Sequence, residues 1–181
     1  MRTLHLNYSN KGGNAIACSR LSESLNKNNT SSEVLTYEQY LKKKYINSKS
    51  KQDLSLVNHK LKKYISIKIK EFFNSENIYK DSINFFNSKI HNYINFHTSD
   101  IVNLHWICDE MISIEEIGKI KKPLVWTIND MWPFIGSEHY TSSNYYEEST
   151  STSVKNIVSS SFASYSASFE PTTYIKTIGV Y

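Results

Sequence analysis

The residues best suited to chemistry lie in the stretch that reads PLVWTINDMWPFIGSEHY. Asn129 and Asp130 follow a predicted strand, and Trp132 and Phe134 flank a proline directly afterwards. Amide and carboxylate groups hydrogen-bond to hydroxyls, and aromatic walls are common in binding sites for small polar molecules. The pattern therefore indicates a sugar or nucleoside site, with His139 nearby. The alternative is that Trp132 and Phe134 only close the end of a sheet.

Two further segments carry candidate ligand-binding groups. Gly12 and Gly13, followed by Asn14, precede a predicted helix, whose free amide groups and partial positive charge suit a phosphate. They form neither a dinucleotide-binding nor a P-loop glycine pattern, which disfavours an ordinary dehydrogenase or P-loop kinase; a plain turn is the alternative. His105 and Trp106 end another predicted strand, where an isolated histidine is more often packed than catalytic.

Strands and helices that alternate along the chain must position these segments. Apolar patterns predict strands at 2–7, 31–37, 99–106 and 124–128. Apolar spacings of four to five predict a helix at 15–29, and Ser113 with Glu116 has capping-box spacing before a short helix at 114–120. This alternation predicts an α/β fold with a Rossmann-like open, mainly parallel sheet and flanking helices. Ligands bind at the carboxyl ends of such strands, where all three candidate segments lie.

The segment from 38 to 95 is predicted to be mostly helical. Between 41 and 70 it holds ten lysines and one acid, so this part carries +9 and the rest of the chain −5. Apolar residues recur at steps of three or four in two runs: Leu54, Val57, Leu61, Ile65, Ile69 and Phe72, then Ile83, Phe86, Ile90 and Ile94. Two interpretations of the first run stay open: a helix lying on anionic lipid, or a helix whose apolar stripe packs on the sheet. The acidic remainder argues against a nucleic-acid-binding module.

The carboxyl-terminal part differs in composition. From Thr141 to Ser168, 14 of 28 residues are Ser or Thr, which is typical of a flexible tail. Ordered apolar residues support another interpretation, in which a strand and a helix lead to a final strand in TYIKTIGVY. Cys18 and Cys108 form neither a disulfide framework nor a metal cluster. Without a signal-peptide pattern or a run of about 18 apolar residues, the expected location is the cytoplasm.

Three stretches together resemble one known family: LHLNYSNKGGNAIACSRL, NLHWI and SIEEIGKIKKPLVWTINDMWPFIGSEHY. They are similar to group 1 glycosyltransferases of the colanic-acid-biosynthesis type, which are retaining, metal-independent GT-B enzymes that make bacterial surface polysaccharides. The resemblance covers 2–37 and 99–140. Asn129 stands where the family usually has a histidine before the aspartate, here Asp130. A later family motif is matched by Gly136, His139 and Tyr140.

The resemblance implies roles for the candidate residues. It makes Asn129 and Asp130 the catalytic residues. It assigns Gly12, Gly13 and Asn14 to the loop that approaches the donor phosphates. It assigns His105, Trp106, Trp132 and His139 to the cleft for the acceptor and the sugar. It implies no metal and no cofactor, because the nucleotide-sugar is a co-substrate.

The expected organisation is an acceptor-side domain at 1–140, with a Lys-rich helical insertion at 38–95 and a degenerate end of the same domain at 141–181. The resemblance implies the N-terminal half of a glycosyltransferase, truncated before its donor-binding domain and without turnover alone. The alternative is a non-catalytic sugar- or nucleotide-binding subunit of a split transferase. Expected partners are a nucleotide-sugar, a glycan or lipid-linked acceptor, a separate donor-domain chain, and the inner membrane face through the Lys-rich helix. No nucleic acid is expected as a partner.

Overall fold

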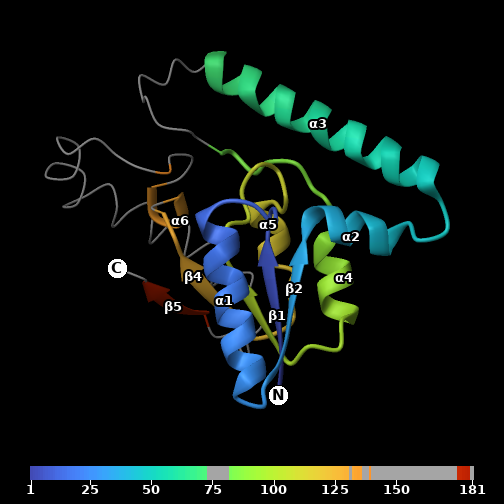
Figure 1. Cartoon of the computed structure of the whole chain (residues 1–181). Helices are drawn as coiled ribbons and strands as arrows, with labels where there is room; N and C mark the ends of the chain where they lie inside the picture. Colours follow the sequence, from blue (N-terminus) through green and yellow to red (C-terminus); the bar gives the residue numbers. More distant parts are fainter. Residues whose placement is uncertain (73–81, 131, 136–138, 140–174, 180–181) are drawn as a thin grey trace, which may run out of the picture.

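A five-stranded parallel sheet forms the centre of the molecule (Figure 1). The computed structural model describes residues 1–72, 82–130, 132–135, 139 and 175–179. The strands lie in the order β2-β1-β3-β4-β5, and their bounds are β1 Arg2–Asn7, β2 Ser31–Thr36, β3 Ile101–Leu104, β4 Leu124–Ile128 and β5 Ile175–Gly179. Every pair of neighbouring strands is parallel. The predicted α/β class, with an open parallel sheet, is confirmed.

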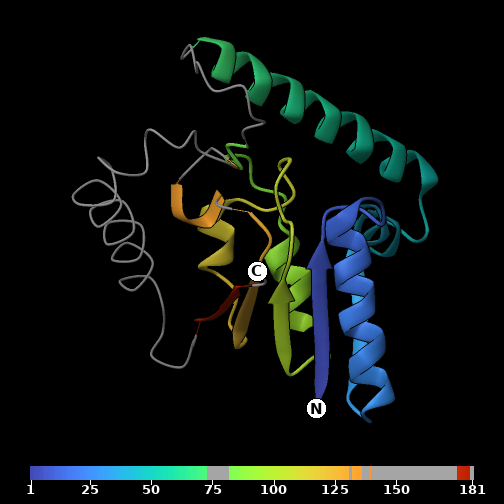
Figure 2. The same cartoon turned by 60° about the vertical axis from the view of Figure 1, so that its left-hand side comes forward.

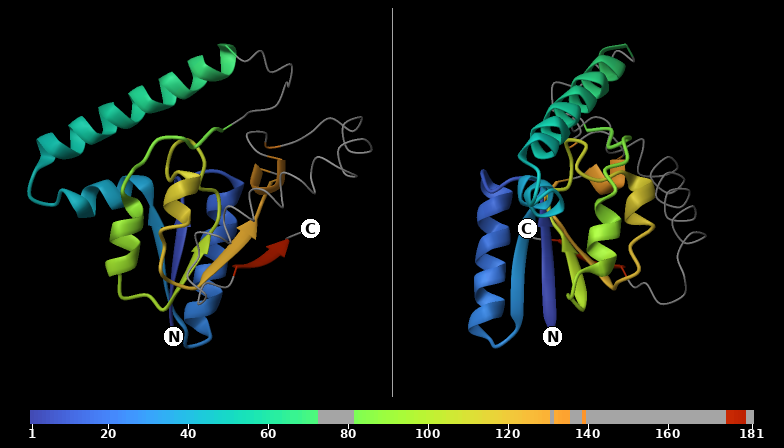
Figure 3. Two further views of the ribbon diagram at one scale, coloured as in Figure 1. Left: turned by 180° about the vertical axis from the view of Figure 1, so that it is seen from behind. Right: turned by 90° about the vertical axis from the view of Figure 1, so that its right-hand side faces the viewer.

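The helices of the described part cover both faces and one end of this sheet. They are α1 Gly13–Lys27, α2 Tyr37–Lys44, α3 Lys49–Phe72, α4 Ile90–Phe96, α5 Ile114–Ile117 and α6 Trp132–Ile135. Helix α1 lies on one face, and α4 and α5 lie on the other (Figures 2 and 3). Helix α3 crosses the end of the sheet where the strands have their carboxyl ends. None of the described helices combines the length and the apolarity that crossing a membrane requires.

Local sequence explains where several helices begin. At α2, the Thr36 and Gln39 side chains each bond to the other residue's backbone amide. Ser113 and Glu116 form the predicted capping box at α5. Such pairs satisfy amide groups that the first helical turn leaves without partners. Helix α1 starts differently, after Gly12, whose φ of +91° favours glycine.

The strand order differs from that of a Rossmann domain at one point. After β2 the chain forms α2 and α3 instead of a further strand beyond β2, and it returns beside β1 as β3. The direction of winding therefore reverses between β1 and β3, as in the 2-1-3-4-5 order of flavodoxin-like sheets. Ligands of such sheets bind at the carboxyl ends of the strands, near this reversal.

The two faces of the sheet differ in polarity. Leu4 and Leu6 are fully buried in the apolar core together with Ile90, Ile94 and other residues of the α4 and α5 side. His5, which alternates with them along β1, points to the opposite face, toward α1. It is fully buried as well, because helices cover both faces of a parallel sheet. The protein thus has an apolar layer on one face and a polar layer on the other.

The segment predicted to be mostly helical contains α2, α3 and most of α4, but its second apolar run is helical only in part. The part with Ile83 and Phe86 is irregular, and a helix begins only at α4. The side chain of Asn84, at φ +51°, explains this, because its amide donates to the carbonyls of Ile107 and Ile112 at 2.8 and 3.0 Å. These bonds hold the segment against the loop after β3 in a conformation that is not helical.

The predicted final strand is β5, which pairs in parallel with β4. The strand and helix predicted ahead of it fall within 140–174, outside the described residues. Gly136 and Tyr140, which match the family motif, lie outside the described residues too.

Candidate functional site

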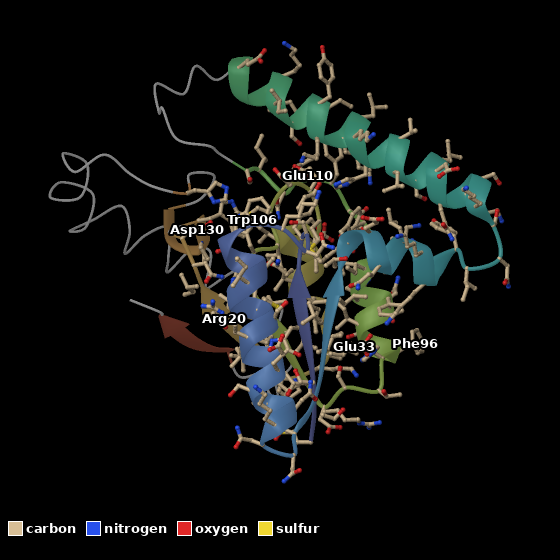
Figure 4. The ribbon with its side chains drawn as sticks, in the orientation of Figure 1. Arg20, Glu33, Phe96, Trp106, Glu110 and Asp130 are labelled. Carbon is tan, nitrogen blue, oxygen red and sulfur yellow. The ribbon has the colours of Figure 1, made fainter. Side chains whose placement is uncertain are left out.

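Asp130 follows β4 at the carboxyl end of the sheet and accepts several hydrogen bonds. Its Oδ2 accepts from Nε1 of Trp106 at 3.1 Å and lies 2.6 Å from Nδ1 of His139. Its Oδ1 accepts from the backbone amide of Trp132 at 3.2 Å. The rings of Trp106 and His139 also stack, with centroids 5.8 Å apart. Three separate segments therefore converge on one carboxylate, at the end of the sheet marked by Asp130 and Trp106 in Figure 4.

His139 extends this group of hydrogen bonds to Ser82. Its Nε2 lies 2.9 Å from Oγ of Ser82, so the order serine, histidine, aspartate is that of a hydrolase triad. However, Ser82 and His139 are only 5% and 4% exposed. The carbonyl of Ser82 also accepts from Nε1 of Trp132 at 2.6 Å. The arrangement thus anchors Asp130 inside the protein, with the buried Trp132 beside it.

Trp106 connects Asp130 to the point where the strand order reverses. Its backbone amide donates to Oδ1 of Asn7 at 3.1 Å, and its carbonyl accepts from the amide of Tyr8 at 2.7 Å. The ring of Tyr8 packs edge-on against that of Trp106, with centroids 5.6 Å apart. The residues that follow β1, β3 and β4 therefore form one continuous surface at the carboxyl end of the sheet.

A cavity of about 530 Å³ opens on the other side of Tyr8, between the carboxyl ends of β1 and β2 and the overlying α3. Its volume is within the usual range for small-molecule sites. Its lining includes three tyrosines, two lysines and a histidine: Tyr8, Tyr37, Tyr64, Lys60, Lys63 and His59. We call this space the α3 cavity.

Lys63, Tyr8 and His59 form a chain of hydrogen bonds in the α3 cavity. Nζ of Lys63 donates to the Tyr8 hydroxyl at 3.3 Å, and that hydroxyl lies 3.2 Å from Nε2 of His59. The Tyr8 oxygen accepts from Lys63, because an ammonium group only donates. Burial, aided by the charge of Lys63, lowers the pKa of His59 to about 4. His59 is therefore neutral at pH 7.

The charge of Lys63 is balanced within the protein. Its Nζ lies 2.8 Å from Oδ2 of Asp109. Burial alone would lower the pKa of Lys63, but the hydrogen bond and the charge of Asp109 outweigh it and raise that pKa. Lys63 thus stays charged beneath α3, while Lys60 also contributes to the lining.

His105 belongs to a different environment from Trp106. It is 3% exposed, and its Nε2 lies 2.9 Å from Nδ1 of His5. Burial lowers the pKa of both histidines to about 4, so both rings are neutral. The structure therefore places His105 in the polar layer beneath α1 and does not bring it to the cleft residues.

Cys18 of α1 completes this polar layer. His5, Cys18 and His105 each offer one potential ligand atom, and these three atoms lie within 4.8 Å of one another. Two imidazole nitrogens and a thiol are donors that suit a soft metal ion. The two imidazoles hydrogen-bond each other directly, and burial raises the pKa of the Cys18 thiol to about 12. With its thiol protonated, Cys18 packs with the two imidazoles between α1 and the sheet.

The remaining predicted site residues, Gly12, Gly13, Asn14 and Asn129, are not among the hydrogen-bond partners named above for Asp130. A side chain added at Gly12 or Gly13 would meet nothing within 4 Å, so the start of α1 is open, with Asn14 partly exposed beside it. Nδ2 of Asn129 donates to the carbonyl of Thr127 at 3.3 Å. In the described part of the chain no hydrogen bond joins Asn129 to Asp130.

Sequence reasoning missed the α3 cavity. The usable signal was the spacing of His59 and Lys63, which lie one turn apart on α3 and on the side opposite the apolar stripe. The partners Tyr8 and Asp109 come from distant loops, so no local pattern could identify them.

Comparisons with protein-family models, with curated proteins and with solved structures found no match to this chain.

Proposed function

We propose that this chain is the acceptor-side part of a nucleotide-sugar-dependent retaining glycosyltransferase of the GT-B fold, acting in bacterial surface polysaccharide synthesis. One observation carries the proposal. Tyr8 lines the α3 cavity and also packs on Trp106, which is hydrogen-bonded to Asp130, so an aromatic cavity and the carboxylate of Asp130 are linked at the carboxyl end of a parallel sheet. The sequence resemblance supports the same assignment.

The α3 cavity offers the groups that bind a glycan acceptor. Tyrosine rings provide faces for the C–H surfaces of a sugar, and their hydroxyls exchange hydrogen bonds with its hydroxyls. Lys60 adds a positive charge at the wall, which suits an acceptor carrying a phosphate or a carboxylate. For Nδ1 of His59 the described residues supply no hydrogen-bond partner. The cavity thus combines aromatic faces with hydroxyl and charged groups, as a site for a glycan requires.

In this proposal Asp130 is a positioning residue. Its hydrogen bonds to Trp106 and His139 fix the loops that flank the acceptor. Preorganised loops lower the entropic cost of bringing the acceptor oxygen to the donor sugar. Asn129 and the open start of α1 at Gly12 and Gly13 are assigned to the reacting sugar and to the donor phosphates, by resemblance alone.

The second candidate is a non-catalytic sugar- or nucleotide-binding subunit that works with a separate donor-domain chain. The contacts of Asp130 favour this second candidate, because both oxygens of its carboxylate already accept hydrogen bonds within the protein. Such a subunit needs the same cavity, so ligand binding alone does not distinguish the two candidates. Both candidates predict no sugar transfer by this chain alone, so sequencing of the flanking DNA distinguishes them: an in-frame donor-binding domain supports the first, and a separately encoded one supports the second.

Ligand-detected NMR on the purified chain tests the binding site. We expect signals for anionic glycans that weaken at least about fivefold in Tyr64→Ala and Lys60→Ala, which alter the cavity wall. Phe96→Ala is the matched control, because Phe96 is exposed and lines a different cavity on α4. Glycan signals that persist in both wall variants, or that weaken only in Phe96→Ala, would refute the assignment of the α3 cavity.

A further inference from the structure

Helix α3 presents its apolar stripe to the outside. Leu54, Val57, Leu61 and Ile65 are 69%, 61%, 55% and 38% exposed. At 100° per residue these four side chains fall within about 80° of one another around the helix. The stripe therefore does not pack on the sheet, which excludes one of the two interpretations that the sequence left open.

Polar contacts on its opposite side hold α3 to the protein. Oγ of Ser66 donates to Oε1 of the buried Glu110 at 2.6 Å, and Lys63 pairs with Asp109. His59 contacts Tyr8 as described above. Figure 4 shows Glu110 beneath α3, with many side chains of the helix directed away from the sheet. The usual arrangement of an amphipathic helix, with apolar residues inward, is thus inverted.

The charge around the stripe indicates what covers it. Helix α3 carries seven lysines and two acids, a net charge of +5. Lys51 lies about 60° from Leu54 around the helix, at the border of the stripe. Lys62, at about 80°, instead donates to the carbonyl of Asn87 at 2.8 Å. A second copy of α3 laid on this face would bring two such charges together. An anionic lipid surface instead attracts the lysines while its acyl region takes the apolar side chains.

We propose that α3 lies in the surface of an anionic lipid bilayer, with Leu54, Val57, Leu61 and Ile65 inserted and the flanking lysines on the headgroups. The helix has 24 residues, so it extends about 36 Å along the surface. Because α3 crosses the carboxyl end of the sheet, docking places the α3 cavity on the membrane-proximal side. That consequence serves a lipid-linked acceptor and rests on the proposed function, whereas the docking itself does not.

Vesicle co-sedimentation of the full chain tests the docking. We expect binding to vesicles of phosphatidylcholine with phosphatidylglycerol, and little binding to phosphatidylcholine alone. Leu54→Ser combined with Leu61→Ser should lower the partition coefficient at least about tenfold, because both inserted apolar groups are removed. Lys51→Glu should also lower it, more at low salt than at high salt.

The matched control is Ile16→Ser combined with Leu21→Ser on α1, since these apolar side chains are also exposed but lie on another helix. We expect it to bind vesicles as the parent chain does. Equal binding to neutral and anionic vesicles, or unchanged binding of the leucine variant, would overturn the proposal. A dimer in light scattering that the leucine variant abolishes would also overturn it, by assigning the stripe to a second copy. Glycan binding by NMR is scored separately, so either proposal can fail alone.

Discussion

Mild acid should destabilise this protein through the histidine pair beneath α1. Burial holds the pKa of His5 and His105 at about 4, against an ordinary value of 6.5. The unfolded chain therefore takes up protons first as the pH falls from 6.5 toward 4. The stability that depends on these two rings being neutral is present above pH 6.5 and is lost as the pH falls from 6.5 to about 4.

The magnitude follows from the two pKa values. Each histidine should remove about 2 kcal/mol of unfolding free energy between pH 7 and pH 5. The pair together should remove about 4 kcal/mol, a large part of the roughly 5–15 kcal/mol that stabilises a typical domain. Positive charge on His5 also opposes protonation of His105, 2.9 Å away, so the pair titrates jointly.

Carboxylates do not account for the same interval. The pKa values of Glu33, Asp100 and Glu115 are lowered by hydrogen bonds to Lys43, to the backbone amide of Arg2 and to Lys119. Stability from such groups is lost only as the pH falls below their ordinary values near 4. The slope between pH 7 and pH 5 therefore reports on buried histidines.

Urea denaturation at several pH values between 7 and 5 measures this slope. The variant His5→Gln with His105→Gln keeps hydrogen-bonding side chains that do not titrate. Between pH 7 and pH 5 it should therefore lose about 4 kcal/mol less unfolding free energy than the parent chain, whatever its stability at pH 7. Cys18→Ala is the control, because it alters the same layer without removing a group that titrates there. An equal slope in the parent chain and the histidine variant would refute the reasoning.

Three further outcomes are expected. Asn84→Ala should lower the unfolding free energy by about 2–4 kcal/mol in urea denaturation, because it leaves two buried carbonyls without their donors; a loss below about 0.5 kcal/mol would contradict its bridging role. Gly12→Ala should cost about 1–2 kcal/mol in thermal unfolding, from the backbone at φ +91° alone, since the space around it is open; an unchanged melting temperature would contradict this. A fluorophosphonate probe should leave Ser82 unlabelled by mass spectrometry, because its hydroxyl is buried; labelling that His139→Gln abolishes would instead indicate a working triad.

Local signals in the sequence predicted much of the architecture. The alternation of apolar segments gave the first four strands and α1, and the capping-box spacing of Ser113 and Glu116 gave the start of α5. Such patterns are reliable because the period of a strand or helix is set by its own backbone geometry. Asp130 was also found in this way, since a polar residue directly after a buried parallel strand lies at the carboxyl edge.

Other features depended on residues far apart in the chain. Asn84 prevents a helix through contacts with carbonyls 23 and 28 residues away. His105 looked like a cleft residue, but its partner is His5, 100 residues earlier, on the face covered by α1. Tyr8 and His59 meet only because α3 crosses the sheet. No local pattern carries such information.

The direction of the apolar stripe on α3 shows the same division. Helical periodicity places Leu54, Val57, Leu61 and Ile65 on one side of a lysine-rich helix, which is readable from the residue order alone. That this side faces outward depends on distant contacts, because Ser66 and Lys63 find carboxylate partners in the loop after β3 and turn the helix toward them. Periodicity determines which residues share a side of a helix, and long-range contacts determine what that side meets.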